Sequence, residues 1–96
     1  MVVVVAYDVN TETKEGQKRL RRVAKLCVNY GQRVQNSVFE ILIDYAKWIA
    51  LKAQLEAEID PTKDSLRYYF LGKNWKRKVE SYGVDRTYDP EGFLMI

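Results

Sequence analysis

The sequence predicts a single α+β domain in which two helices cover one face of an antiparallel sheet. Two observations carry this prediction. Val2 to Val5 form a continuous apolar run, which is typical of a strand buried on both faces. Two later segments place apolar residues at helical spacing, and the remaining apolar segments are short and strand-like. A chain of 96 residues has the length of one small domain, and we expect residues 1–96 to form it.

The first strand is predicted over residues 2–8 and ends at Tyr7-Asp8, before a polar loop at 10–13. A helix should follow from about residue 15 to residue 30. Its apolar face recurs in steps of three and four residues and consists of Leu20, Val23, Ala24, Cys27 and Val28. Gly31 is expected to end this helix in the left-handed conformation that helix ends often adopt.

A long second strand is predicted over residues 33–43. Both of its sides are polar near the start and apolar later, so it should be half exposed first and buried at its end. Asp44 is placed to cap the next helix by accepting a hydrogen bond from a backbone N–H. That helix should extend to about Glu58 and end at Asp60-Pro61, with an apolar stripe of Trp48, Leu51, Leu55 and Ile59.

The last part of the chain predicts a strand over 65–71, a turn at 72–74 and a polar edge strand at about 76–82. A short apolar strand at about 92–96 ends the sequence. We assign the chain to the ferredoxin-like βαββαβ pattern, an antiparallel sheet with both helices on one face, extended by a short C-terminal strand, although the elements above, counted singly, run βαβαββ before that strand. This fold hosts many functions, so it identifies no activity by itself.

Two features favour a twofold dimer. The helices cover one sheet face only, although the first strand is apolar on both, and the end of the chain, 93–96, is entirely apolar. In a dimer the open sheet faces would meet and the strand 92–96 would pair with the partner's sheet edge. The alternative is that this segment folds back on its own sheet.

The composition excludes several kinds of chemistry. The chain contains no histidine, which excludes histidine-based triads and ribonuclease chemistry that uses a histidine pair. Its single cysteine, Cys27, excludes an internal disulfide and a thiolate zinc cluster, and its place on a helix's apolar side indicates a packed thiol. Any hydrolysis would therefore rely on carboxylates, a bound metal or the substrate itself for proton transfer.

Basic residues are clustered, although the formal net charge is only +3. Five lie between residues 14 and 22, and four surround Trp75 in the segment 73–78. Such clusters indicate either a polyanionic partner or a solvated helix face and a charged sheet edge. No segment resembles a membrane span or a signal peptide, so we expect a cytoplasmic protein without a membrane partner.

Asp8 is the candidate that these observations single out for chemistry. It stands at the end of a buried strand, where a carboxylate either caps the following loop or offers a ligand to a metal or a substrate. Four stretches of the chain are each similar to motifs of one known protein family. They are Tyr7-Asp8, 21–25, the run Gly31-Gln32-Arg33-Val34-Gln35-Asn36-Ser37-Val38-Phe39-Glu40, and 64–69. Over essentially its full length the chain resembles the second CRISPR-associated protein, the small universal protein of CRISPR adaptation modules.

The resemblance implies a ferredoxin-like homodimer that binds Mg²⁺ or Mn²⁺ through Asp8 of both subunits. It implies a metal-dependent endonuclease, acting on single-stranded RNA in some members and on double-stranded DNA in others, of which we favour DNA here. It also implies a part in spacer acquisition, in which the protein bridges copies of the CRISPR adaptation integrase. An architectural adaptor that holds duplex DNA without cleaving it is the alternative. Residues that bind or support nucleic acid map onto Tyr7, Arg22, Arg33, Ser37 and Phe39.

Each of these supporting residues also has a simpler explanation. Arg22 and Arg33 either clamp phosphates or form surface ion pairs with Glu12 or Glu15. Ser37 either hydrogen-bonds a metal-bound water or is an ordinary strand hydroxyl, and Phe39 either lines the dimer interface beside Asp8 or belongs to the core. Family members differ in their helix arginines, so Arg19 and Arg21 receive no role.

Overall fold

The computed structural model describes residues 1–72 and 79–84 of the chain. Five strands and two helices follow one another in the order β1 (Val2–Asp8), α1 (Lys14–Tyr30), β2 (Gly31–Gln35), β3 (Val38–Leu42), α2 (Tyr45–Glu58), β4 (Ser65–Leu71) and β5 (Val79–Gly83). The basic segment 73–78 around Trp75 and the predicted strand 92–96 lie outside the described residues.

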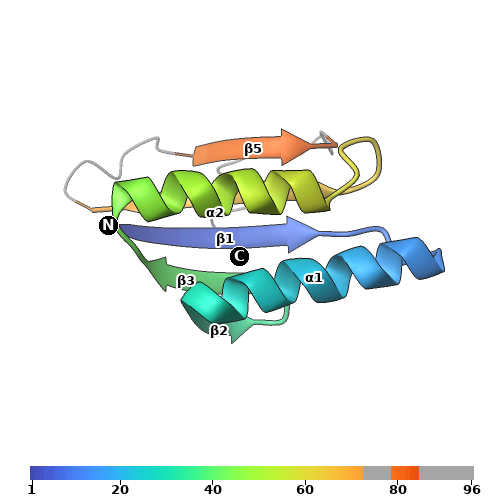
Figure 1. Ribbon diagram of the computed structural model, residues 1–96, viewed down its shortest axis with the longest axis horizontal. Coiled ribbons are helices and arrows are strands. Elements are labelled where there is room, and N and C mark those ends of the chain that lie inside the picture. The colour runs from blue at the N-terminus through green and yellow to red at the C-terminus, as the bar shows by residue number, and fades with distance from the viewer. Residues whose placement is uncertain (73–78, 85–96) are drawn as a thin grey trace.

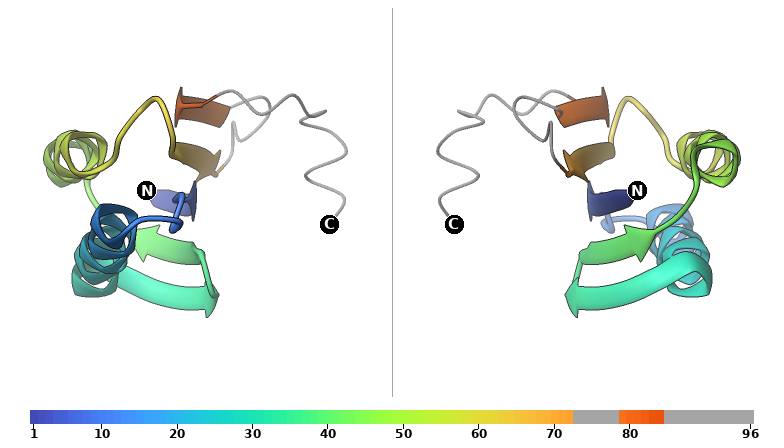
Figure 2. Two further views of the ribbon diagram at one scale, coloured as in Figure 1. Left: turned by 90° about the vertical axis from the view of Figure 1, so that its right-hand side faces the viewer. Right: turned by 90° about the vertical axis from the view of Figure 1, so that its left-hand side faces the viewer.

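The strands form one antiparallel sheet in the order β2-β3-β1-β4-β5, with β1 at its centre (Figure 1). Both helices lie on the same face of this sheet, as the two side views in Figure 2 show. The first six elements follow the βαββαβ order, so the predicted α+β, ferredoxin-like class is confirmed. No helix within 1–72 and 79–84 is long and apolar enough to cross a membrane.

The predicted long strand over 33–43 is wrong, because this segment forms a hairpin of two strands. β2 and β3 pair antiparallel across a two-residue turn at Asn36-Ser37, and their register shifts between Arg33 and Gln35. The polar first half of the segment is the edge strand β2, and the apolar second half is β3, which pairs with β1. The change from polar to apolar residues thus marks two strands rather than two halves of one.

Helix α1 begins and ends close to its predicted residues, but Gly31 does not have the predicted conformation. Thr13 caps the helix by accepting a hydrogen bond from the Gly16 N–H at 3.0 Å. Gly31 is not left-handed: its φ is −154°, which is extended backbone, and it is already the first residue of β2. The predicted apolar face is correct at Val23 and Cys27, which are buried, but Val28 is exposed and therefore does not belong to the core.

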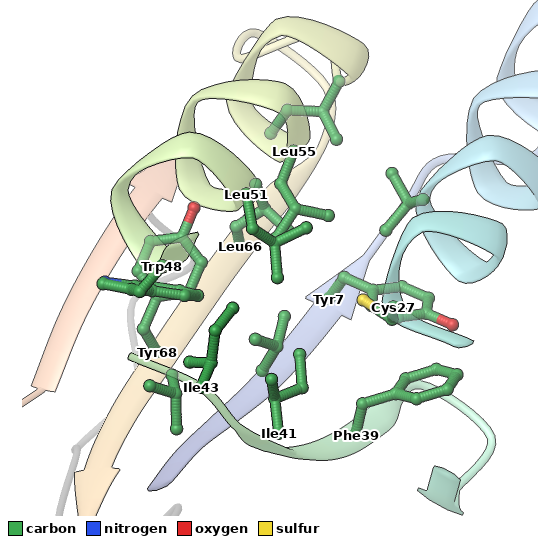
Figure 3. Packing of buried hydrophobic residues seen from close by; sticks show 14 of the residues in the cluster. Tyr7, Cys27, Phe39, Ile41, Ile43, Trp48, Leu51, Leu55, Leu66 and Tyr68 are labelled. Carbon is green, nitrogen blue, oxygen red and sulfur yellow. The ribbon is translucent and has the colours of Figure 1, made fainter. Parts of the chain in front are cut away.

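Helix α2 matches its prediction closely. Asp44 caps it by accepting a hydrogen bond from the Lys47 N–H at 2.8 Å, as expected. The predicted stripe is buried against the sheet and consists of Trp48, Leu51, Leu55 and Ile59. Figure 3 shows Trp48, Leu51 and Leu55 of α2 beside β4, where Trp48 meets Tyr68 edge to face with ring centroids 5.0 Å apart.

The side chains of β1 alternate between the two faces of the sheet. Val3, Val5 and Tyr7 are buried beneath the helices and join the core cluster. The alternate residues of β1 therefore project from the opposite face, which carries no helix among the described residues (Figure 2). We call this the open face. Asp8 lies on it, at the end of the central strand.

The open face carries apolar side chains at the start of β1. Val2 lies opposite Leu42 of β3 on one side and opposite Leu71 of β4 on the other. Residues directly opposite in an antiparallel pair project from the same face, so these three side chains form a row across the sheet. Leu42 is 77% exposed and Leu71 is 46% exposed. The row supplies apolar area that this one chain leaves open to solvent.

Candidate functional site at the end of strand β1

Asp8 is exposed and occupies the last position of β1. Its position in the sheet is fixed because it lies opposite Ser65, the first residue of β4. Ala6, two residues earlier on the same face, lies between Val38 of β3 and Arg67 of β4. The Asp8 carboxylate is therefore held at the rim of the open face by a strand that is paired with a neighbour on each side.

Tyr7 points in the opposite direction, into the core. Its ring stacks against Phe39 with centroids 6.1 Å apart and an interplanar angle of 21°. The Arg33 guanidinium carbon lies 5.1 Å from the centroid of the Phe39 ring, within range for a cation–π interaction. The exposed Arg33 guanidinium of β2 is therefore held against the Phe39 ring of β3, which in turn packs against Tyr7.

The interior of this stack is poorly solvated, and the pKa values follow from that. Burial raises the pKa of the Tyr7 phenol, while the nearby Arg33 charge works in the opposite direction. Burial raises the pKa of the Cys27 thiol to about 12, so Cys27 is a protonated, packed side chain (Figure 3). The packed thiol expected from its helix position is confirmed.

The other predicted residues lie at separate places. Ser37 is in the β2–β3 turn, where its carbonyl oxygen accepts a hydrogen bond from the Tyr7 N–H at 3.0 Å. Phe39 is fully buried on the helix side of the sheet, so within this chain it does not lie beside Asp8. The Arg22 guanidinium forms an ion pair with Glu58 of α2 at 3.2 Å, and not with Glu12 or Glu15. Its side chain remains 64% exposed, so this pair leaves much of it accessible.

Sequence reasoning missed Asp64, the only fully buried charged residue in the described part of the chain. Its carboxylate forms an ion pair with Arg19 at 2.7 Å, which gives Arg19 a structural role that the sequence did not assign. Although burial by itself would raise the pKa of Asp64, hydrogen bonds from Arg19 and from two backbone N–H groups lower it below its usual range. Only its position directly before a strand, within the stretch 64–69, could have drawn attention to it.

Helix α1 presents a row of exposed basic residues away from the core. The row recurs at steps of four, three and four residues and consists of Lys14, Lys18, Arg21 and Lys25. Within 1–72 and 79–84, none of the four forms an ion pair. The row spans about 16 Å along the helix, at a rise of about 1.5 Å per residue. We call it the α1 basic row.

A divalent metal fits this site only in part. Mg²⁺ and Mn²⁺ prefer oxygen ligands, which the exposed Asp8 carboxylate supplies. Among the described residues, however, no group of three or more acidic or cysteine side chains is arranged to hold a metal ion. One chain therefore contributes one carboxylate, and the donor set suits a metal when a second copy adds another.

The fold and the site together define a ferredoxin-like α+β protein with an exposed carboxylate at the end of its central strand and a basic helix surface. The family profile described as "CRISPR associated protein Cas2" matches residues 1–79. The chain belongs to this Cas2 family, as the resemblance of its motifs predicted.

Two relatives illustrate the similarity in sequence. The chain is 56% identical over 96 residues to the CRISPR-associated endoribonuclease Cas2 of Chlorobaculum tepidum, covering all of both chains. It is 54% identical over 96 residues to the CRISPR-associated endonuclease Cas2 of Halalkalibacterium halodurans, again covering all of both.

The fold is similar to that of a solved structure of Cas2 from Streptococcus pyogenes at pH 6.5, with a TM-score of 0.71 and 60% identity. That comparison covers 86% of this chain and all of the other.

Proposed function

We propose that this protein is a metal-dependent endonuclease of the CRISPR adaptation machinery, whose centre forms when two copies place their Asp8 carboxylates together. The observation that carries the proposal is the exposed Asp8 at the rim of an apolar open face. A second copy that covers this face would shield the apolar row and would add the carboxylate that a single chain lacks. The relatives named endoribonuclease and endonuclease support cleavage of a phosphodiester backbone.

The residues of the site would have three different roles: metal binding, phosphate binding and structural support. Asp8 and the partner subunit's Asp8 would hold Mg²⁺ or Mn²⁺, which when bound lowers the pKa of a coordinated water and neutralises charge on the phosphate. Arg33, fixed on the Phe39 ring, and the largely exposed Arg22 would bind phosphate oxygens with their planar guanidinium groups. Tyr7 and Phe39 support this arrangement from within the core, and Ser37 does so through its backbone hydrogen bond to Tyr7.

The test is a cleavage assay on end-labelled duplex DNA and on single-stranded RNA, each with Mg²⁺, Mn²⁺ or EDTA. We expect cleavage of duplex DNA that EDTA abolishes, with single-stranded RNA as the alternative substrate. Asp8→Asn removes the charge of the only proposed ligand and should lower the cleavage rate at least about 100-fold, corresponding to about 3 kcal/mol of transition-state stabilisation.

Glu12→Gln is the matched control, because it removes one exposed carboxylate four residues away in the β1–α1 loop. Its cleavage rate should stay within about twofold of the unchanged protein, since surface charges outside the site contribute little. Cleavage by Asp8→Asn at the rate of the Glu12→Gln control would contradict the proposed centre. Identical cleavage in EDTA would contradict the role of the metal.

A second function is supported by the α1 basic row. Four exposed cations in line could hold the phosphate backbone of a duplex without any cleavage, as an adaptor that presents DNA to the integrase would need. Lys18→Gln and Arg21→Gln should then each weaken duplex binding and lower the salt dependence of the affinity by about one phosphate contact. Spacer acquisition that persists in Asp8→Asn and fails in these two variants would make the adaptor the biological function.

A further inference from the structure

The buried Asp64 carboxylate is bound by three different segments of the chain. Its Oδ1 accepts hydrogen bonds from the Asn10 N–H at 2.9 Å and from Arg19 Nη2 at 3.3 Å. Its Oδ2 accepts hydrogen bonds from the Asp60 N–H at 2.9 Å and from Arg19 Nε at 2.7 Å. One side chain thus joins the β1–α1 loop, helix α1 and the α2–β4 loop.

Two of these connections lead directly to Asp8. Asn10, whose N–H Asp64 binds, comes two residues after Asp8. Ser65, which follows Asp64 in the sequence, lies opposite Asp8 in the pairing of β1 with β4. The backbone is therefore fixed both where β1 ends and across the sheet from that point.

The surrounding backbone leaves little room for a different arrangement. A Cβ at Gly16 in α1 would overlap the carbonyl oxygen of Asn10, so the loop passes in direct contact with the helix. A Cβ at Gly83 would overlap the carbonyl oxygen of Asp64, which also accepts a hydrogen bond from the Val84 N–H at 2.9 Å. Asp64 is held from both its side chain and its backbone, and it cannot shift without moving the end of β1.

A neutral side chain could not do the same. The four donors around Asp64 are two N–H groups of the guanidinium and two backbone N–H groups, and only a carboxylate offers acceptors on both of its oxygens. An amide would turn its NH₂ group toward donors. Arg19 in turn supplies the charge that makes burial of this carboxylate tolerable.

We infer that Asp64 and Arg19 are positioning residues, which fix the backbone just after Asp8 and across the sheet from it and so aim its carboxylate at the shared metal. This inference rests on the proposed function for the role of Asp8. Neither residue touches the substrate or the metal. Their loss should weaken metal binding and slow cleavage about 10- to 100-fold, the range found when partners that orient a metal ligand are removed. Binding of nucleic acid should change little.

The experiment compares Asp64→Asn and Arg19→Lys with two controls in the full-length protein. Arg19→Lys retains the charge but loses the planar fork, so it should fold and should show an intermediate effect. Glu80→Gln breaks the exposed ion pair of β5 with Lys52 at 3.1 Å, and Leu55→Ala removes a fully buried side chain from α2. The first controls for loss of an ion pair and the second for loss of stability.

Three quantities are measured well below each variant's melting temperature: Mn²⁺ affinity by electron paramagnetic resonance, kcat and KM for cleavage, and amide hydrogen exchange over residues 7–10. For Asp64→Asn we expect weaker Mn²⁺ binding, a lower kcat at nearly constant KM, and faster exchange in this segment. Glu80→Gln should retain the Mn²⁺ affinity, kcat and local exchange of the unchanged protein. Leu55→Ala should retain the Mn²⁺ affinity and kcat, and its exchange should rise only as far as its lower global stability requires.

The inference is overturned if Asp64→Asn and Arg19→Lys fold and keep the Mn²⁺ affinity, kcat and local exchange of Leu55→Ala. A different result is expected if the proposed function itself is wrong. The unchanged protein would then neither bind Mn²⁺ nor cleave, which also removes the metal ligand that the pair is inferred to aim. If the unchanged protein neither binds Mn²⁺ nor cleaves, faster amide exchange over residues 7–10 in Asp64→Asn would identify Asp64 as a purely structural residue. That result would also overturn the positioning role.

Discussion

Replacement of Asp64 by Asn should be among the most destabilising single changes in this chain. The carboxylate is completely buried and accepts four hydrogen bonds, whereas the Arg19 side chain keeps 15% of its surface exposed. Breaking a buried ion pair by removing one partner costs about 3–5 kcal/mol. We expect a loss of about 3 kcal/mol at pH 7, the lower end, because Arg19 can regain water and the amide oxygen still accepts two of the four bonds. For a domain of this size that corresponds to a fall in Tm of about 12–24 °C.

The pH dependence of the stability provides a second, independent test of this prediction. Burial alone would raise the pKa of Asp64, but the hydrogen bonds from Arg19, Asp60 and Asn10 lower it in the folded state. A carboxylate with a depressed folded-state pKa stabilises the protein above its unfolded pKa of about 3.9, and this contribution is lost as the pH falls through the folded value. The difference between the unchanged protein and Asp64→Asn should therefore be constant from pH 7 to pH 5 and shrink below about pH 4.

Urea denaturation followed by far-ultraviolet circular dichroism, at one protein concentration and at pH 7, 5 and 3, measures both effects. Glu80→Gln serves as the control, since its exposed ion pair with Lys52 should contribute no more than about 1 kcal/mol. A loss below about 1 kcal/mol at pH 7 would refute the argument from burial and hydrogen bonding. A difference between the two proteins that is as large at pH 3 as at pH 7 would refute the assignment of the effect to the Asp64 charge.

Three further predictions follow from other features. Gly16→Ala should lower the free energy of unfolding, measured by urea titration, by at least about 2 kcal/mol, because the alanine Cβ would overlap the Asn10 carbonyl oxygen. This loss should occur although alanine favours helices over glycine by about 1 kcal/mol. An unchanged midpoint of the urea transition would contradict the contact. Burial raises the pKa of the Cys27 thiol to about 12. At pH 8 the thiol should therefore react with a thiol reagent at least about 100-fold more slowly in the folded protein than in urea. Equal rates in the two conditions would show that the thiol is accessible in the folded protein. Val4→Lys places a charge on the open face opposite Glu40, so the chain should still fold; if two copies pair through this face as proposed, sedimentation should report a dissociation constant of that dimer raised at least about tenfold. A dimer that this variant leaves unaffected would place the interface elsewhere.

Most of the fold follows from local patterns in the sequence. The bounds of β1, α1, α2 and β4 could be predicted because apolar periodicity and capping residues act over a few positions, as Asp44 does at the start of α2. The β2–β3 hairpin could not be predicted in this way, because its turn, Asn36-Ser37, lacks the glycine that marks most two-residue turns. Gly31 likewise took its conformation from pairing with β3, which is a tertiary effect.

The candidate site was predictable only in its separate parts. The position of Asp8 follows from the end of an apolar run, and a family resemblance added Arg22 and Arg33. The contact of Arg33 with Phe39 depends on the register of β2 against β3, and the pair of Arg19 with Asp64 joins residues 45 positions apart. Such contacts arise from packing, on which a single sequence carries no local signal.

The alternation of β1 has a consequence for how this protein tolerates change. Tyr7 and Asp8 are neighbours in the chain but project from opposite faces, one into the core and the other into solvent. Deletion of a single valine from the run 2–5 would exchange the two, burying a carboxylate and exposing a phenol ring. Exchange of those valines for isoleucine or threonine would leave the parity intact. The length of the valine run therefore determines which face of the sheet Tyr7 and Asp8 project from, whichever β-branched residues the run contains.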